Sequence, residues 1–277
     1  MSEDLNFESL FAAAVVRKSA NRSNTERQEW LKERCGYVNG SKCSDVMSCG
    51  RGKHPEGWGY EKIYNFGATF ETRAKILKLE RQYGYSADGF EGSSATAYGH
   101  IVEPYIIEMI GAEKCDDSLI IVKDVLRCTP DFVIRNVIET IAGEIKAATN
   151  WSTYASRAIA EYNNKHTDYW QHVAEMLALR TNKLRYITAL PARDLRGVLN
   201  GDLINNVAIG HDVIIDLNLE DAAALLFRSA CCSLVAQGKT AFDLDYSIYL
   251  SMLDFLQRGE FEQCYDYLSF EMQSIIK

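Results

Sequence analysis

The chain has 277 residues, of which 47% are hydrophobic and 25% charged, and its formal net charge is −8. This is the ordinary mixture of a globular protein, and it excludes a disordered chain, a collagen-like repeat and a coiled coil. The charge is unevenly distributed, because residues 1–82 hold 14 Lys and Arg against 11 Asp and Glu, while the remainder holds 16 against 27. The negative net charge argues against a protein that binds nucleic acid over its whole surface.

No apolar run reaches the roughly 18–20 residues that a membrane span requires. The N-terminus is acidic before a short apolar stretch, which is the reverse of a signal peptide. We therefore expect an intracellular protein without a membrane segment. Its eight cysteines include no CxxC pair, so we expect reduced, mostly buried thiols and no zinc site.

Hydrophobic spacing predicts the elements in chain order. The helices expected in the first part are Asp4–Ser19, Asn24–Cys35, a short one from Ser41 within the glycine-rich segment 36–60, Thr69–Tyr83 and Ser93–Ile110. Short runs rich in β-branched residues then predict central strands at Leu119–Arg127, Asp131–Ile134 and Thr140–Lys146. The last elements expected are helices Trp151–Tyr162 and Asp168–Arg180, strands Leu184–Leu190 and Val207–Leu217, and helices from Glu220 onward.

This order predicts an α/β (α+β) fold with a small mixed central sheet flanked by helices. No linker divides the chain, so we expect a single domain over residues 1–277. Its core is expected at about 28–217, with a helical C-terminal extension at about 218–277. The aromatic pattern of that extension indicates helical core, or alternatively a subunit interface.

Three charged residues stand out in the strand-rich stretch. Asp131 opens one predicted strand, and Glu144, Ile145 and Lys146 lie on the next, beginning thirteen residues further on. Successive side chains of a strand point to opposite faces, so Glu144 and Lys146 share a face, and Asp131 joins them if the strands form a hairpin. Carboxylates hold Mg²⁺ and a lysine orients or deprotonates a nucleophile, which suits phosphodiester hydrolysis. The alternative is a surface Glu–Lys pair on an ordinary strand.

A third carboxylate, Glu103, lies on the helix predicted before these strands. Its neighbours Ile101, Val102, Ile106 and Ile107 are apolar. A charge on an inward-packing helix is costly unless it is paired or binds a metal, so Glu103 is a further candidate for the site. The alternative is a surface glutamate.

Four short motifs appear in one order along the chain. They are the segments WLKERCGYVNGS at 30–41, GHIVE at 99–103, CTPD at 128–131 and GEIK at 143–146. In this order they resemble the PD-(D/E)XK nucleases, and within them the lambda exonuclease or YqaJ-like viral recombinase family. The resemblance covers about residues 28–190 and implies a restriction-endonuclease-like core.

The resemblance implies a role for each matching residue. Asp131 and Glu144 would be metal ligands together with the Ile145 carbonyl, Glu103 would complete the metal site, and Lys146 would position or activate the attacking water. The implied ion is Mg²⁺, and Mn²⁺ commonly substitutes at such oxygen sites.

A second group of matching residues concerns the end of the DNA. Arg34, Ser41 and Thr129 match residues that in the family grip the 5′-phosphate of the digested strand. A guanidinium fork and hydroxyls suit a terminal phosphate. For Arg34 the alternative is a solvated cation at a helix C-terminus.

The helix predicted at 69–83 is basic, with Arg73, Lys75, Lys78 and Arg81. It is a candidate face for contact with DNA phosphates, or alternatively a solvated helix face.

Family members assemble as toroidal trimers that thread duplex DNA. The resemblance therefore implies double-stranded DNA ends as substrate, a homo-oligomer, and a single-strand annealing protein as a partner.

The sequence departs from the family pattern at two places. Asn39 stands where the family has a threonine, so an amide replaces one hydroxyl. On the helix at 168–180 the expected glutamine position holds His172, with Gln171 one residue early, and Ala174 occupies a second glutamine position. Either Gln171 or His172 is a candidate to act in the site.

We therefore expect a Mg²⁺-dependent 5′→3′ double-strand DNA exonuclease that leaves 3′ single-stranded overhangs for viral or phage recombination or genome processing, in the host cytoplasm or nucleus. One alternative is an endonuclease that acts on DNA or RNA with the same metal site. Another is a non-catalytic binding or assembly protein that kept the fold, but Asp131, Glu144 and Lys146 are all present. Arg34 and Ser41 distinguish the two enzymes, because a terminal-phosphate pocket requires a free 5′ end.

Overall fold

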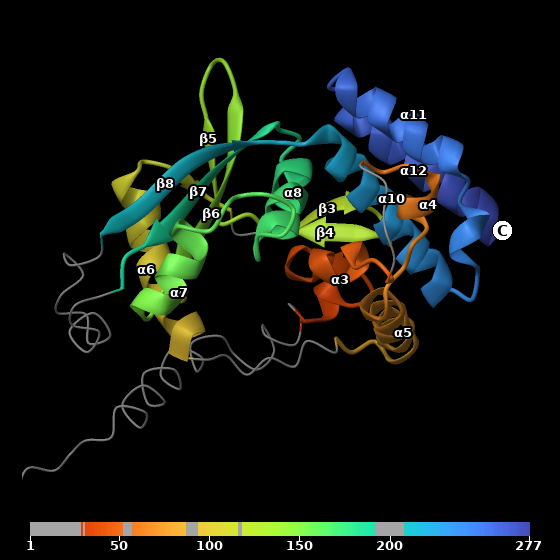
Figure 1. The fold of residues 1–277 in the computed structure, drawn as a ribbon, viewed down its shortest axis with the longest axis horizontal. Helices are drawn as coiled ribbons and strands as arrows, with labels where there is room; N and C mark the ends of the chain where they lie inside the picture. The colour runs from red at the N-terminus through yellow and green to blue at the C-terminus, as the bar shows by residue number, and fades with distance from the viewer. Residues whose placement is uncertain (1–28, 30, 52–56, 87–93, 116–117, 192–207) are drawn as a thin grey trace, which may run out of the picture.

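The computed structural model describes residues 29, 31–51, 57–86, 94–115, 118–191 and 208–277, which form two sheets with helices around them (Figure 1). The larger sheet has the order β2-β5-β6-β7-β8, with strands β2 (Glu113–Lys114), β5 (Phe132–Arg135), β6 (Thr140–Ala147), β7 (Lys183–Ala189) and β8 (Ile209–Asp216). The smaller sheet has the order β1-β4-β3, with strands β1 (Val38–Asn39), β3 (Leu119–Val122) and β4 (Leu126–Cys128).

The helices in the described part of the chain fall into two groups. Those near the larger sheet are α6 (Ser94–Met109), α7 (Trp151–Ala158) and α8 (Tyr169–Ala178). The others are α3 (Cys43–Met47), α4 (Tyr60–Ile63), α5 (Ala68–Tyr83), α10 (Leu219–Ala236), α11 (Tyr246–Gln257) and α12 (Phe261–Ile276), with short 3₁₀ helices η1 (Gly40–Lys42) and η3 (Ala241–Asp243). Figure 1 shows the second group gathered around the smaller sheet.

The larger sheet is mixed. Strands β5 and β6 form an antiparallel hairpin, β6 runs parallel to β7, and β7 is antiparallel to β8. In the hairpin Phe132 faces Gly143, and a Cβ added to Gly143 would lie 2.1 Å from the Phe132 ring. Glycine is therefore required at this position, one residue before Glu144, for the ring to lie flat against the strand.

Helices cover both faces of the larger sheet. On one face Tyr98, Val102 and Ile106 of α6 form a core cluster with Ile145 and Ile187. On the opposite face α8 contacts β6 and β7, and its apolar residues belong to the main core. Side chains of β6 therefore alternate between α6 and α8, as the period of a strand requires.

The main core surrounds α10, which is buried along almost its whole length and contacts α3, α5, α8 and α11. The helix begins at the N-cap Asn218, whose side chain accepts a hydrogen bond from the Asp221 backbone N–H at 3.1 Å. This cap satisfies one of the free N–H groups of the first turn. Residues from Val38 to Met272 thus belong to one core cluster.

The predicted fold class is confirmed, but one predicted strand is wrong. Leu119–Arg127 is not a single strand, because the chain turns between β3 and β4, where Asp124 adopts a φ of 61°. An aspartate tolerates this left-handed conformation better than most residues, and it permits the turn. Both strands belong to the smaller sheet rather than lying beside β5.

The other elements follow the predictions closely where they are described. The basic and the apolar helix expected at 69–83 and 93–110 are α5 and α6, and the C-terminal extension is helical. The helix Asp4–Ser19 and the start of the next one lie outside the described residues. None of the described helices combines the length and apolar character that a membrane crossing needs. None of the eight cysteines, all within the described part, forms a disulfide.

Candidate active site

The β5–β6 hairpin brings the three predicted charged residues together. The Ile145 backbone N–H donates to Asp131 Oδ2 at 2.7 Å, which fixes the aspartate beside strand β6. Ile145 packs toward α6, while Glu144 and Lys146 point to the opposite face, toward α8. The predicted alternation and the predicted hairpin are therefore both present.

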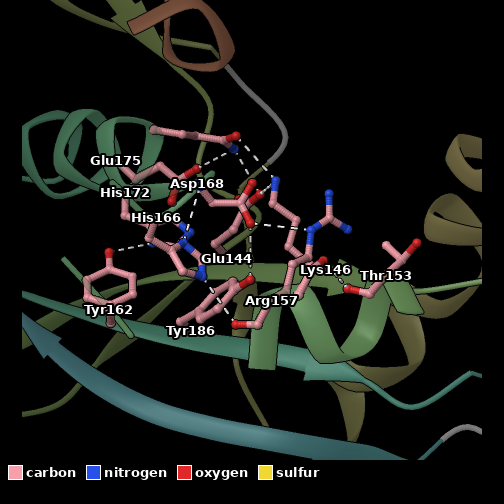
Figure 2. Close-up of polar contacts among 12 residues, drawn as sticks. Glu144, Lys146, Thr153, Arg157, Tyr162, His166, Asp168, His172, Glu175 and Tyr186 are labelled. Carbon is pink, nitrogen blue, oxygen red and sulfur yellow. Dashed lines mark hydrogen bonds and ion pairs between the residues drawn. The ribbon is translucent and has the colours of Figure 1, made fainter. Parts of the chain in front are cut away.

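Gln171 on α8 connects the residues on this face. Its Nε2 group donates to Glu144 Oε1 and to Glu175 Oε1, both at 2.8 Å, and its Oε1 accepts from Lys146 Nζ at 3.2 Å. Lys146 also forms an ion pair with Glu144. Figure 2 shows Lys146 and Glu175 reaching toward Glu144 from different elements. We call Asp131, Glu144, Lys146, Gln171 and Glu175 the acidic cluster.

The electrostatics of the acidic cluster reflect an excess of negative charge. Burial raises the pKa of Asp131 well above its ordinary value, and the nearby charges of Glu144 and Glu103 raise it further. Burial and the neighbouring Glu144 likewise raise the pKa of Glu175. For Lys146, burial alone would lower the pKa, but the carboxylates around it outweigh burial, so its pKa lies above its usual range.

The acidic cluster has the donor chemistry of a divalent-metal site. Carboxylate oxygens are the hard ligands that Mg²⁺ prefers. Glu144 Oε2 and Glu175 Oε2 are buried without a hydrogen-bond partner, and leaving such oxygens unpaired is costly. Among the described residues, no group of three or more His, Cys, Asp or Glu side chains is arranged so that it could hold a metal ion as it stands. The unpaired oxygens nevertheless fit a cation, because it would satisfy them and offset the excess charge.

Glu103 lies on α6. It is partly exposed, and its charge contributes to the raised pKa of Asp131. Its role in the metal site remains a prediction.

The residues predicted for the 5′-phosphate lie next to the acidic cluster. A Cβ added to Gly40 would lie 2.3 Å from Cys128 Sγ and 3.8 Å from Gln171 Cγ, so η1 packs directly on the site. Ser41 in η1 is exposed, and Thr129 follows Cys128 at the end of β4, its hydroxyl buried without a hydrogen-bond partner.

Arg34 also belongs to this neighbourhood, because its charge acts on the Cys128 thiol. The departure at Asn39 has a structural explanation. The Asn39 side-chain amide donates to the carbonyls of Arg34 and Tyr37, at 3.3 and 3.4 Å. It therefore holds the turn between the helix that carries Arg34 and the segment that carries Ser41.

Of the two candidates on this helix, His172 makes no hydrogen bond to the acidic cluster and lies in the core. The ring is fully buried and stacks on Tyr162, whose hydroxyl is 2.6 Å from His172 Nδ1. Its ring also lies against Tyr186, with centroids 4.5 Å apart. Gln171, one residue earlier and about 100° away around the helix, is the candidate whose side chain contacts Glu144, Lys146 and Glu175.

Arg73 is likewise not part of an exposed basic face. Only 6% of it is exposed, and its guanidinium donates to Asp45 at 2.8 Å. Arg81 donates to the carbonyls of Gly36, Asp124 and Ser233. Two of the four predicted cations thus hold the fold together. The others, Lys75 and Lys78, are exposed.

Sequence reasoning missed two carboxylates near the site. Glu175 lies one helical turn after Gln171, and that i, i+4 spacing is the signal that could have found it. Asp168, at the start of α8, accepts from the Tyr186 hydroxyl at 3.1 Å and lies 3.4 Å from Arg157 Nε (Figure 2). Its charge contributes to the raised pKa of Lys146.

The fold is similar to those of solved exonucleases. The alkaline exonuclease LHK-Exo from Laribacter hongkongensis, in complex with dAMP, matches with a TM-score of 0.52 and 15% identity over 85% of this chain and 98% of that chain. A phage-related exonuclease from Haemophilus somnus 129PT matches with a TM-score of 0.50 and 14% identity, over 73% and 96% of the two chains. No family model and no curated protein matches the sequence. At these identities the likeness concerns the fold, and the chain shares its fold with these solved exonucleases, in agreement with the resemblance that its motifs indicated.

Proposed function

We propose that this protein is a divalent-metal-dependent exonuclease that digests the 5′ strand of double-stranded DNA and leaves 3′ single-stranded overhangs. The observation that carries the proposal is the contact network of Asp131, Glu144, Lys146 and Gln171. It combines metal-binding carboxylates with a cation at one spot, and it does so in a fold shared with exonucleases.

The residues divide the work of hydrolysis between them. Asp131, Glu144 and Glu103, with the Ile145 carbonyl, would hold Mg²⁺ or Mn²⁺. When bound, such an ion polarises a phosphoryl oxygen and makes a water more acidic. Lys146, kept charged by its carboxylate neighbours, orients the attacking water and stabilises negative charge on the phosphate.

Gln171 fixes the geometry of this pair. Its amide touches both the Glu144 carboxylate and the Lys146 ammonium, so neither side chain can rotate freely. Holding reacting groups in place in this way is itself a large part of catalysis.

End specificity would come from the residues beside η1. Arg34, Ser41 and Thr129 supply a guanidinium and two hydroxyls next to the acidic cluster, which suits a terminal 5′-phosphate. An enzyme that recognises a terminal phosphate works from DNA ends. A ring of identical subunits around the duplex and a single-strand annealing protein as partner belong to the same proposal.

The test compares 5′-phosphorylated linear duplex with covalently closed circular DNA, in Mg²⁺ and in EDTA. We expect loss of the linear duplex alone, only with Mg²⁺, and a fall of at least about 10²-fold in rate for Lys146→Ala, because a charge-stabilising group is removed. Lys183→Ala is the matched control, since Lys183 lies on β7 and pairs with Glu139 instead.

The other outcomes would indicate a different activity or contradict the proposal. Cutting of the circle would make the protein an endonuclease and remove the role given to Arg34. Loss of an RNA substrate instead of DNA would indicate a ribonuclease with the same site. Digestion that does not depend on Lys146 or on a metal would contradict the proposal.

A further inference from the structure

Glu175 is a buried carboxylate to which the four sequence motifs assign no role. It lies on α8 with no exposed surface, in a helix whose face toward β6 also carries Gln171. A fully buried glutamate is rare unless it is paired or binds a metal. Its place in the molecule therefore needs an explanation.

Hydrogen bonding explains only half of the carboxylate. Glu175 Oε1 accepts from Gln171 Nε2 at 2.8 Å, but Oε2 is buried without a partner. Glu144 repeats this arrangement, with Oε1 bonded to the same Gln171 amide and Oε2 unpartnered. Two buried carboxylates thus share one amide donor, and each keeps an unsatisfied oxygen.

The local charges do not balance either. Glu144, Glu175 and Asp131 lie within electrostatic reach of one another, and Lys146 is the ammonium among them. Leaving like charges unbalanced in a buried site is costly, whereas one divalent cation would offset the excess.

A buried glutamate with a purely structural role would have different hydrogen-bond and charge partners. The buried Glu80, for comparison, accepts a hydrogen bond from the Gly36 backbone N–H at 3.0 Å and lies beside Arg81 on α5. The strongest charged neighbour of Glu175 is a second carboxylate, Glu144, and the Lys146 ammonium acts on it more weakly.

We propose that Glu175 is an additional ligand of the divalent cation held by Glu144, with Gln171 as the positioning residue that aligns the two carboxylates. The inference rests on the proposed metal-dependent function and adds a ligand from α8 to those on the β5–β6 hairpin. Clamping the ion between helix and sheet would also fix α8 against β6. Ion binding is then expected to stabilise the fold as well as to enable hydrolysis.

The experiment measures Mn²⁺ binding to the intact chain by the electron paramagnetic resonance signal of the free ion, without DNA. We expect wild type to bind Mn²⁺ and Glu175→Gln to bind it at least about tenfold more weakly, because one oxygen ligand is lost. Glu175→Asp keeps the charge but shortens the reach, so we expect intermediate binding. Glu80→Gln, an isosteric change of a buried glutamate elsewhere, is the matched control and should bind as wild type does.

Thermal unfolding separates a ligand from a structural group. In EDTA, Glu175→Gln should melt no lower than wild type, because it removes like-charge repulsion, but it should lose most of the stabilisation that Ca²⁺ gives wild type. A lower melting temperature in EDTA with an unchanged gain from Ca²⁺ would assign Glu175 a structural role and overturn the proposal.

Glu144→Gln separates this inference from the function on which it rests. If Glu144→Gln abolishes Mn²⁺ binding while Glu175→Gln and Glu175→Asp bind as wild type does, Glu175 is not a ligand and the proposed nuclease still stands. If wild type binds no Mn²⁺ at all, both proposals fail.

Discussion

His172 is a core residue, although its place in the sequence motif made it a candidate for the active site. Burial lowers the pKa of His172 well below its ordinary value, and the nearby charges of Lys146 and His166 lower it further. The folded protein therefore holds this ring neutral, stacked on Tyr162 and packed at an angle against Tyr186. In the unfolded chain the same ring takes up a proton below about pH 6.5.

This difference predicts an acid sensitivity. The folded pKa is depressed, so stability from the neutral ring is complete above about pH 6.5 and is lost as the pH falls below it. At pH 5.5 we expect the loss from this one group to be on the order of 1 kcal/mol in the free energy of unfolding. We expect urea unfolding at pH 7.5 and 5.5 to show a smaller pH effect for His172→Gln than for wild type, by about that amount. Equal pH effects in both proteins would show that the ring is protonated in the folded state.

The sequence located some of these residues better than others. Alternation along β6 needed only the period of a strand, so Glu144 and Lys146 were placed correctly on one face. On α8 a shift of one residue turns a side chain by about 100°, and the motif alone did not distinguish Gln171 from His172. The family pattern gives no signal for Glu175, because its second glutamine position falls on Ala174, one residue earlier.

At the scale of elements, α10 is joined to α3 and α4 by one buried arginine. Arg228 has no exposed surface, and its guanidinium donates to carbonyls at the ends of those helices, among them Val46 at 2.8 Å, Ile63 at 2.9 Å and Ser48 at 2.6 Å. Its charge also lies over the Phe66 ring, 4.6 Å from the centroid. Burial lowers the pKa of Arg228, which shows the cost of keeping this group in the core.

Removal of this guanidinium should therefore be severe. Arg228→Met keeps much of the volume but leaves several buried carbonyls without donors, and we expect the free energy of unfolding to fall by about 3 kcal/mol or more. Chemical denaturation measures the loss. Arg258→Met, at an exposed arginine that pairs with Asp254 and Glu260, should change it by no more than about 0.5 kcal/mol. A small effect at Arg228 would mean that water replaces the guanidinium.

Element boundaries show what a sequence pattern does and does not determine. Helix α5 begins and ends within one residue of its predicted limits, and α10 begins within one residue of Glu220, where helical structure was predicted to start. Leu119–Arg127 reads as one apolar strand because the turn at Asp124 contains no glycine or proline to mark it. Strands β1 and β2 have two residues each, too few to carry a period, and only tertiary pairing reveals them.

At the scale of the whole molecule, an acidic protein must bind DNA through local positive surface. The net charge of −8 repels a polyanion at long range, so contacts with phosphates have to come from particular cations. Of the basic residues on α5, Arg73 and Arg81 are already bound to groups of the protein. Lys75 and Lys78 are exposed and remain candidates.

The salt dependence of DNA binding tests whether α5 contacts DNA. Each phosphate contact releases counterions. Removal of one lysine that makes such a contact therefore makes the negative slope of log K for DNA binding against log salt concentration less steep by about 1. We expect this change for Lys78→Ala, with a similar loss of affinity for every DNA sequence, measured by fluorescence anisotropy in EDTA to prevent cleavage. Lys239→Ala, after the end of α10, is the control and should leave the slope unchanged. An unchanged slope for Lys78→Ala would mean that α5 presents an ordinary solvated face and that the duplex is held elsewhere on the molecule.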